Sequence, residues 1–251
     1  IKFKLFMRVI ARLDIKNEFV IKGINFEGLR KIGNPNQIAK KFYEDGIDEI
    51  IYNDCVASLY QRNSLEKIVK DTAKDIFVPL IVSGGIRSEK DAELLMKNGA
   101  DKLAINSALF KNKELAKLLV NKYGSQSIML SVEAKKISKN SWEAYINFGR
   151  DKTNIDVIEW IKEMSSLNFG EILLTSIDAD GVSNGFDVEL YENVCKHINI
   201  PIIAGGGFGK LNHISELKKY AKIDAISISK ALHYEKVKIN EIKDFVQNIN
   251  E

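Results

Sequence analysis

The chain has 251 residues, with 37 Lys and Arg against 34 Asp and Glu, which gives a formal net charge of +3. So small an imbalance gives no reason to expect binding to nucleic acid or to a membrane surface. Hydrophobic residues make up 45% and charged residues 28% of the chain, as in globular proteins, which excludes disorder and low-complexity arrays.

The two cysteines, Cys55 and Cys195, form no CxxC motif, and neither they nor the three histidines show the spacing of zinc ligands. We therefore expect no metal, no cofactor and a reducing, cytoplasmic compartment. Arg8 and Arg12 interrupt the apolar stretch near the start, which argues against an export signal, and no apolar run is long enough to span a membrane.

Short apolar runs rich in β-branched residues recur along the chain and predict eight strands. They lie at 8–15, 48–54, 77–83, 101–107, 127–133, 170–177, 199–205 and 223–229. Amphipathic segments between them have helical spacing, as at Ala39 and Phe42, and Ser88 and Asn112 are candidate N-caps. Eight units of about 31 residues favour a closed (β/α)8 TIM barrel over an open doubly wound sheet, in one domain over 1–251.

The two halves of the chain resemble each other at an offset of about 122 residues. Val78–Gly85 resembles Ile200–Gly207, and Asp101–Leu109 resembles Asp224–Leu232. The barrel is therefore predicted to consist of two duplicated half-barrels, in which each feature lies opposite its copy. The longest pieces outside the repeat, residues 16–34 and 135–153, follow the first and fifth strands, on the face where such barrels hold their active sites.

Two similar groups of glycines and polar residues follow strands in the two halves. They are Gly84 and Gly85 with Asn106 and Ser107, and Gly206 and Gly207 with Ser229 and Lys230. Glycines let backbone N–H groups converge on an anion, so each half is predicted to form one phosphate cradle. The substrate would then carry a phosphate at each end. The alternative is that the glycines only make the turns.

Two carboxylates, Asp14 and Glu133, end the first and fifth strands in similar contexts. Facing each other across the barrel mouth, they can supply a general acid and a general base if their environments separate their pKa values. The alternative is that each is a solvated carboxylate at a strand end.

Four charged residues begin strands at the opposite end of the barrel: Arg8, Glu49, Lys102 and Glu171. Period-two counting places Arg8 on the same face as Asp14, and Glu171 on the same face as Thr175. These charges are predicted to form a ring that closes the barrel floor. The alternative is a set of ordinary surface charges.

Five motifs of the chain resemble those of a known family: RVIARLDIKNEFVIKGINFEGLRKIGNP, IVSGGIRSEKDA, GADKLAINSAL, GEILLTSIDADG and IPIIAGGG. Nearly end to end, the chain resembles the HisF family, the cyclase subunit of imidazole glycerol phosphate synthase. The loop Lys22–Phe26 separates it from the sister isomerase HisA.

The resemblance implies that a HisH-like glutaminase docks under the floor and releases ammonia, which crosses the charged ring and travels through the barrel. At the mouth it attacks a bisphosphorylated aminoimidazole carboxamide ribonucleotide. The products are imidazole glycerol phosphate, on the way to histidine, and the released carboxamide nucleotide.

The resemblance also implies residue roles. Asp14 would be the principal acid and base, Glu133 the second carboxylate, and Lys22 part of a loop that covers the substrate. One phosphate site would comprise Gly85, Asn106 and Ser107, and the other Asp180, Gly181, Gly207, Ser229 and Lys230. Thr175 and Asp54 would line the pocket, and Asp101 would contact the glutaminase.

Several residues depart from the family pattern. Glu133 replaces an Asp, and Arg12 replaces a small residue, where it would block the ammonia path, pair with Asp14 or bind another anion. Further departures are Ser83, Phe208, Lys230, Asn53 and the segment Leu59–Gln61. These departures leave two alternatives open: a paralogue that channels ammonia to a sugar amidotransferase making acetamidino sugars for surface polysaccharides or flagellar glycans, and a scaffold that only activates the glutaminase.

Overall fold

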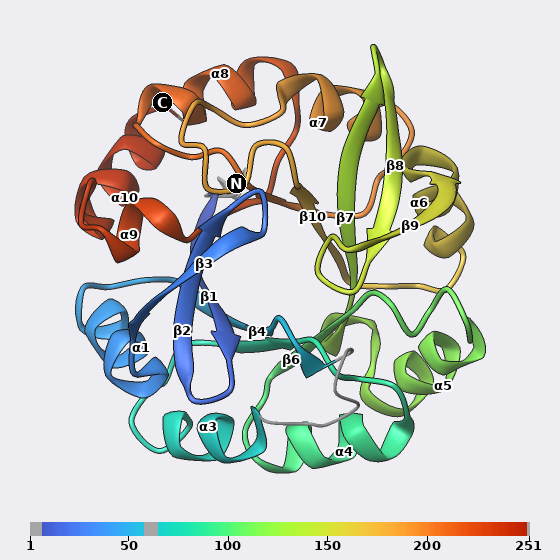
Figure 1. The fold of residues 1–251 in the computed structure, drawn as a ribbon, viewed down its shortest axis with the longest axis horizontal. Coiled ribbons are helices and arrows are strands. Elements are labelled where there is room, and N and C mark those ends of the chain that lie inside the picture. Colours follow the sequence, from blue (N-terminus) through green and yellow to red (C-terminus); the bar gives the residue numbers. More distant parts are fainter. Residues whose placement is uncertain (1–6, 58–64, 250–251) are drawn as a thin grey trace, which may run out of the picture.

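The computed structural model describes residues 7–57 and 65–249, so that Leu59–Gln61 lie outside the described residues. Eight parallel strands form its centre: β1 (Arg8–Lys16), β4 (Glu49–Asp54), β5 (Leu80–Ser83), β6 (Lys102–Ile105), β7 (Ile128–Ser138), β10 (Glu171–Ser176), β11 (Ile202–Gly205) and β12 (Ala225–Ile228). Each pairs with the next, and β12 pairs with β1, which closes the ring (Figure 1). The predicted (β/α)8 barrel and its eight strands are confirmed.

Helices surround the strands: α1 (Pro35–Glu44), α3 (Leu65–Thr72), α4 (Glu89–Lys97), α5 (Glu114–Tyr123), α6 (Val157–Ser165), α7 (Val188–Cys195), α8 (Asn212–Tyr220), α9 (Lys230–His233) and α10 (Ile239–Asn248), with the short 3-10 helix η1 (Ser125–Ser127) before β7. Ser88 caps α4 as predicted, because its side chain accepts from the backbone N–H of Asp91. The prediction for Asn112 is wrong: α5 begins at Glu114 after Lys113, without a side-chain cap. None of the described helices is long and apolar enough to cross a membrane.

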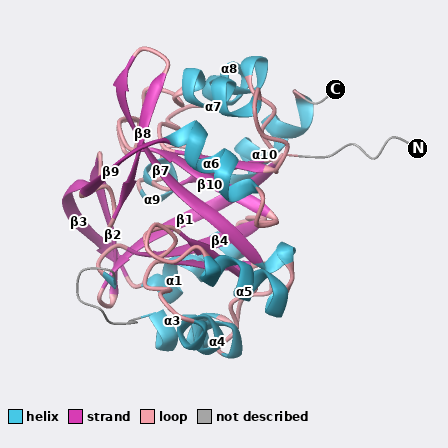
Figure 2. Ribbon diagram, turned by 90° about the vertical axis from the view of Figure 1, so that its right-hand side faces the viewer, coloured by secondary structure: helices cyan, strands magenta, loops and turns pink. Residues whose placement is uncertain are grey.

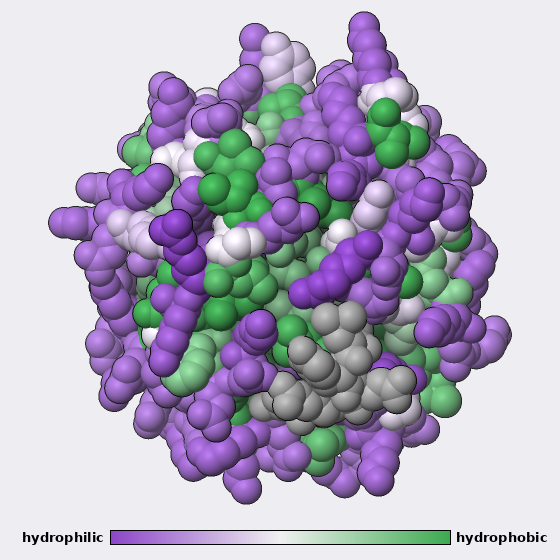
Figure 3. Space-filling model, viewed as in Figure 1, coloured by the Kyte–Doolittle hydropathy of each residue, from purple (hydrophilic) through white to green (hydrophobic). Residues whose placement is uncertain are grey.

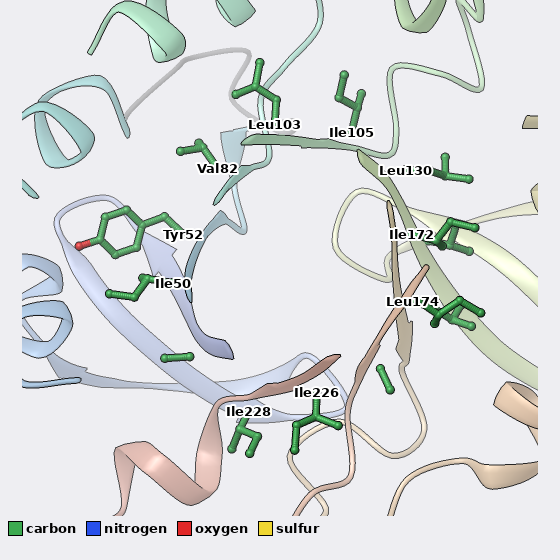
Figure 4. Close-up of a cluster of buried hydrophobic side chains, with 14 of the residues drawn as sticks. Ile50, Tyr52, Val82, Leu103, Ile105, Leu130, Ile172, Leu174, Ile226 and Ile228 are labelled. Carbon is green, nitrogen blue, oxygen red and sulfur yellow. The ribbon is translucent and has the colours of Figure 1, made fainter. Parts of the chain in front are cut away.

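The barrel strands are buried on both faces, which is why their sequences are nearly continuous apolar runs. Side chains such as Tyr52, Leu103 and Ile172 point outward to the helices and join the main core (Figure 4). Alternate side chains point into the barrel and form a second cluster, with one residue from each of the eight strands. This apolar ring consists of Ile10, Ile51, Ile81, Ala104, Met129, Leu173, Ile203 and Ala225.

The two long pieces after β1 and β7 each fold as a hairpin. The first contains β2 (Phe19–Ile24) and β3 (Glu27–Gly33), and the second extends β7 through β8 (Ser141–Ile146) and β9 (Asp151–Asp156). Both project from the same end of the barrel (Figure 2). This is the end at which the parallel strands finish, so the hairpins lie over the predicted mouth.

Candidate active site

Asp14 is buried at the end of β1 and is surrounded by hydrogen-bond donors. Its Oδ1 accepts from Arg12 Nε at 2.8 Å and from Asn53 Nδ2 at 2.9 Å, and its Oδ2 accepts from Lys22 Nζ at 3.1 Å. Burial alone would raise the pKa of Asp14, but Arg12 and Lys22 outweigh it and hold this pKa well below its usual value. Asp14 is therefore a carboxylate at any working pH.

Glu133 lies near the end of the buried part of β7 and has a different environment. Its Oε2 accepts from the backbone N–H of Gly149 at 2.9 Å. Burial raises the pKa of Glu133 to about 7, because one backbone hydrogen bond and the more distant Arg12 do not offset the loss of water. The two carboxylates thus have the separated pKa values that acid and base roles require.

Lys22 lies in β2 and forms ion pairs with two aspartates, Asp14 at the end of β1 and Asp180 after β10. Besides Asp14 it donates to Asp180 Oδ2 at 2.6 Å, and the side chains of all three residues are almost completely buried. Burial would lower the pKa of Lys22, but Asp180 and Asp14 outweigh that effect and raise it, so Lys22 remains charged. The first hairpin is fixed to the barrel by this buried ion pair.

Arg12 points into the barrel, one inward position above Ile10, and is only 4% exposed. Its Nη1 donates to Thr175 Oγ1 on β10 at 3.1 Å, so the side chain crosses the interior from β1. The guanidinium also lies 5.5 Å from the ring centroid of Phe26. Of the three interpretations that the sequence left open, pairing with Asp14 is observed.

The first predicted cradle lines a cavity of about 280 Å³. Gly84, Gly85, Asn106 and Ser107 all face it, together with Glu133 and residues of β4 and the second hairpin. Asn106 donates to the carbonyl of Tyr145 at 3.2 Å, while its Oδ1 is buried and has no partner in the part of the chain that the structure describes. Ser107 Oγ accepts from the backbone N–H of Asn147 at 3.0 Å. The structure therefore brings these predicted residues together around one space.

The first glycine of each cradle is required by the turn itself. Gly84 and Gly206 both have a φ of +89°, and a Cβ there would lie 2.4 Å from the carbonyl oxygen of Asp54 and 2.6 Å from that of Ser176, respectively. The turn interpretation thus accounts for both residues. Asp54 has a local role as well, because its Oδ1 accepts from the backbone of Val56 at 3.0 Å and that of Ala57 at 2.8 Å.

The second cradle is more closely covered than the first. A Cβ on Gly207 would lie 1.9 Å from the carbonyl oxygen of Gly185, and one on Gly181 would lie 2.3 Å from that of Gly23 in the first hairpin. The hydroxyls of Ser183, Ser227 and Ser229 are buried and find no partner among the described residues. Lys230 donates to the carbonyl of Gly181 at 2.5 Å, and burial lowers the pKa of this lysine.

Of the remaining departures, Ser83 lines the first cavity, and Phe208 is buried with its ring 6.2 Å from that of Phe186.

The four charges at the floor form the predicted ring. Arg8 pairs with Glu49 and with Glu171, while Lys102 approaches Glu49 at 3.3 Å and Glu171 at 2.8 Å. Burial would raise the pKa of Glu171, but Arg8 and Lys102 outweigh it and lower this pKa. The alternative of separate surface charges is wrong, because each charge contacts both neighbours of opposite sign.

Asp101 lies at the same end of the barrel and is exposed. Its Oδ2 accepts from the backbone N–H of Leu80 at 2.8 Å. Its counterpart in the other half, Asp224, accepts from Ile202 in the same way at 3.1 Å. Asp101 therefore has a strand-end role that its copy shares.

The sequence reasoning missed the second hairpin's contribution. Gly149 binds Glu133, and Arg150 donates to the carbonyls of Cys55 at 3.2 Å and Asn147 at 2.9 Å. The tripeptide Ile-Asn-Phe occurs at 24–26 and again at 146–148, and this repeat was the signal that could have found it.

In the space-filling view, apolar residues gather near the middle of the mouth within a hydrophilic rim (Figure 3). Among the described residues, no group of three or more His, Cys, Asp or Glu could hold a metal.

Comparison with known proteins shows the family of the chain. A family model described as "Histidine biosynthesis protein" matches residues 8–238. The imidazole glycerol phosphate synthase subunit HisF of Legionella pneumophila is 50% identical over 209 residues, which cover 83% of this chain and 99% of that protein. The HisF subunit of Bacillus cereus (strain AH187) is 41% identical over 243 residues, which cover 97% of this chain and 96% of that protein. The chain belongs to the HisF family.

The HisF relatives bear on the alternatives that the sequence departures raised. Another relative, from Bacillus cereus (strain Q1), is 41% identical over 97% of this chain and has the same name. A paralogue that serves a sugar amidotransferase is therefore not favoured. The names describe the relatives as subunits, which indicates a complex with another subunit.

Proposed function

We propose that this chain is the cyclase subunit of an imidazole glycerol phosphate synthase. It would use ammonia to convert a bisphosphorylated aminoimidazole carboxamide ribonucleotide into imidazole glycerol phosphate and the released carboxamide nucleotide. The observation that carries this proposal is the pair Asp14 and Glu133, two buried carboxylates at one barrel mouth with pKa values displaced in opposite directions.

The separated pKa values suggest a division of roles between the two carboxylates. Glu133, with a pKa of about 7, can accept a proton from the attacking nitrogen and return one during ring closure. Asp14 remains an anion while Arg12 and Lys22 contact it, and it stabilises positive charge that develops on nitrogen. This division gives Glu133 the larger share of proton transfer, whereas the resemblance alone gave it to Asp14.

Two anion-binding regions at the mouth support a substrate with two phosphates. The cavity at Gly85, Asn106 and Ser107 would bind one end. Gly207, Ser229 and Lys230 would bind the other end, with Lys22 and Asp180 between them. The first hairpin has to move for a ligand to reach this second region, because Gly23 lies against Gly181.

The floor supports a partner that supplies ammonia. A neutral molecule can pass between the four ring side chains when one ion pair opens, whereas an ion meets charges of both signs. We propose that the partner is a HisH-like glutaminase, that Asp101 contacts it, and that the complex works in the cytoplasm.

The test is turnover of the bisphosphorylated substrate by the purified chain with ammonium salt, followed by the fall in substrate absorbance. We expect turnover by the wild type and about a 100-fold slower rate for Glu133→Asp, because the shorter side chain draws the carboxylate away from Gly149. Glu133→Gln, which keeps the length and the hydrogen bond but cannot transfer the proton, is the matched control. No turnover by the wild type at any ammonium concentration would overturn the proposal.

A further inference from the structure

The interior of the barrel above the apolar ring is divided into two unlike halves. On the side of β4, β5, β6 and β7, inward residues line the cavity of about 280 Å³: Asn53, Ser83, Ala104, Ser131 and Glu133. On the side of β10, β11, β12 and β1, the guanidinium of Arg12 reaches across to Thr175. A permanent cation thus occupies one half, and a cavity occupies the other.

Ala104 belongs both to the apolar ring and to the wall of the cavity. It is one of the eight residues of the apolar ring and also lines the cavity, so the interior of the barrel meets the cavity at this residue. Ala104 is fully buried, so the apolar ring adjoins the cavity inside the barrel and away from bulk water. The ring has one other alanine, Ala225 on β12, and the described residues that line the cavity do not include it.

Several contacts hold the side chain of Arg12 in place, so that it fills its half of the barrel interior. Its Nε bonds Asp14 at 2.8 Å, its Nη1 bonds Thr175 at 3.1 Å, and the ring of Phe26 lies over the guanidinium. A cation with two such partners in a buried position moves only if Asp14 or Thr175 loses its partner, which is costly. A small neutral molecule therefore meets less resistance at a methyl group than at Arg12.

We propose that ammonia leaves the apolar ring past Ala104 and enters the cavity beside Glu133, with Arg12 acting as a partition that closes the other half of the barrel. This inference rests on the proposed function and deepens it. It identifies Ala104 as the positioning residue of the route, and it delivers the nucleophile to the side of Glu133 and the first phosphate cradle. Asp14 adjoins the same cavity through Asn53, which lines it and donates to Asp14 Oδ1 at 2.9 Å.

The experiment compares two rates in the complex of the chain with its glutaminase partner. Ammonia made from glutamine enters below Ala104, whereas ammonium salt supplies ammonia directly at the mouth. The ratio of the glutamine-driven rate to the ammonium-driven rate therefore reports transit through the barrel and is independent of the chemical step. Glutaminase activity is measured alongside to correct for changes in ammonia production.

Ala104→Val is expected to lower this ratio about tenfold, because the packed interior leaves no room for two further methyl groups beside the passage. Ala225→Val is the matched control: it adds the same volume to the same ring and should leave the ratio within about twofold of wild type. Arg12→Met in the Ala104→Val background should recover part of the ratio, since it removes the partition.

The outcomes separate the two proposals. No product from the wild type with ammonium salt overturns the proposed function and the route with it. Product from the wild type with an unchanged ratio in Ala104→Val, or with equal losses in Ala104→Val and Ala225→Val, overturns the route alone. An Arg12→Met change that gives no recovery removes Arg12 as the partition. Thermal unfolding of each variant shows whether a lower ratio results from misfolding. If Ala104→Val misfolds, the smaller substitution Ala104→Ser replaces it and should lower the ratio less.

Discussion

Phe26 and Phe148, at the tips of two hairpins in opposite halves of the chain, stack with ring centroids 4.1 Å apart and an interplanar angle of 17°. Both have positive φ angles, +65° and +59°, and each follows an asparagine that also has a positive φ. The two tips are copies of one turn that meet over the barrel mouth. Stacking therefore links the hairpin that carries Lys22 to the hairpin that binds Glu133.

Breaking this stack should loosen both hairpins, whichever ring is removed. In Phe26→Ala and in Phe148→Ala, we expect faster amide hydrogen exchange across both β2–β3 and β8–β9. The double variant should lower the free energy of local opening by about 1 kcal/mol less than the sum of the two single decreases. Phe77→Ala, at a ring that is 78% exposed, is the control and should leave these amides unchanged. Faster exchange in only the mutated hairpin would contradict the link.

The raised pKa of Glu133 makes stability fall with pH. Below about pH 4 this carboxyl is protonated in both the folded and the unfolded chain, and burial carries no ionisation penalty. As pH rises, the unfolded chain ionises first, so the free energy of unfolding falls until pH passes about 7, by roughly 3 kcal/mol in total. Glu133→Gln does not titrate there.

Urea unfolding from pH 4 to pH 8 measures this difference. The stability of Glu133→Gln relative to wild type should increase over that interval, with the change centred between about pH 4.5 and 7. A constant difference across the range would show that Glu133 has an ordinary pKa in the folded protein.

Asp14 is predicted to be a large contributor to stability as well as to activity. Asp14→Asn leaves Arg12 buried without its anion and Lys22 with Asp180 alone, and should cost about 3 to 5 kcal/mol at pH 7. In the double variant, which also carries Arg12→Met, the loss of unfolding free energy should be smaller than the sum of the two single losses by at least about 1 kcal/mol. Asp71→Asn, at an exposed pair with Lys67, is the control, with a change within about 0.5 kcal/mol. Additive losses would show that Arg12 does not depend on Asp14.

Asp101 and Asp224 allow a test of the partner surface, because they form the same strand-end hydrogen bond in the two halves. Asp101→Ala and Asp224→Ala should each lower stability by about 1 kcal/mol. Only Asp101→Ala should weaken binding of the glutaminase, measured by titration calorimetry. Equal weakening by both, or by neither, would remove Asp101 from the interface.

The order of the strands and the inward positions were predictable because both follow from local patterns. Period-two alternation places Arg8, Arg12 and Asp14 on one face of β1 whatever the rest of the chain does. The contact between Arg12 and Thr175 was not predictable, because it depends on the width of the closed barrel. The Phe26–Phe148 stack likewise required backbone turns with positive φ, which propensities assign to glycine rather than to phenylalanine.

Arg12 has a further consequence for a barrel made of two similar halves. Counting back two residues from Asp14 gives Arg12, and counting back two from Glu133 gives Ser131, so a guanidinium in one half corresponds to a hydroxyl in the other. A two-fold symmetric mouth would bind an elongated ligand with a phosphate at each end equally well in either orientation. Because Arg12 and Ser131 differ, the two halves of the mouth differ in charge, and such a ligand would fit in only one orientation.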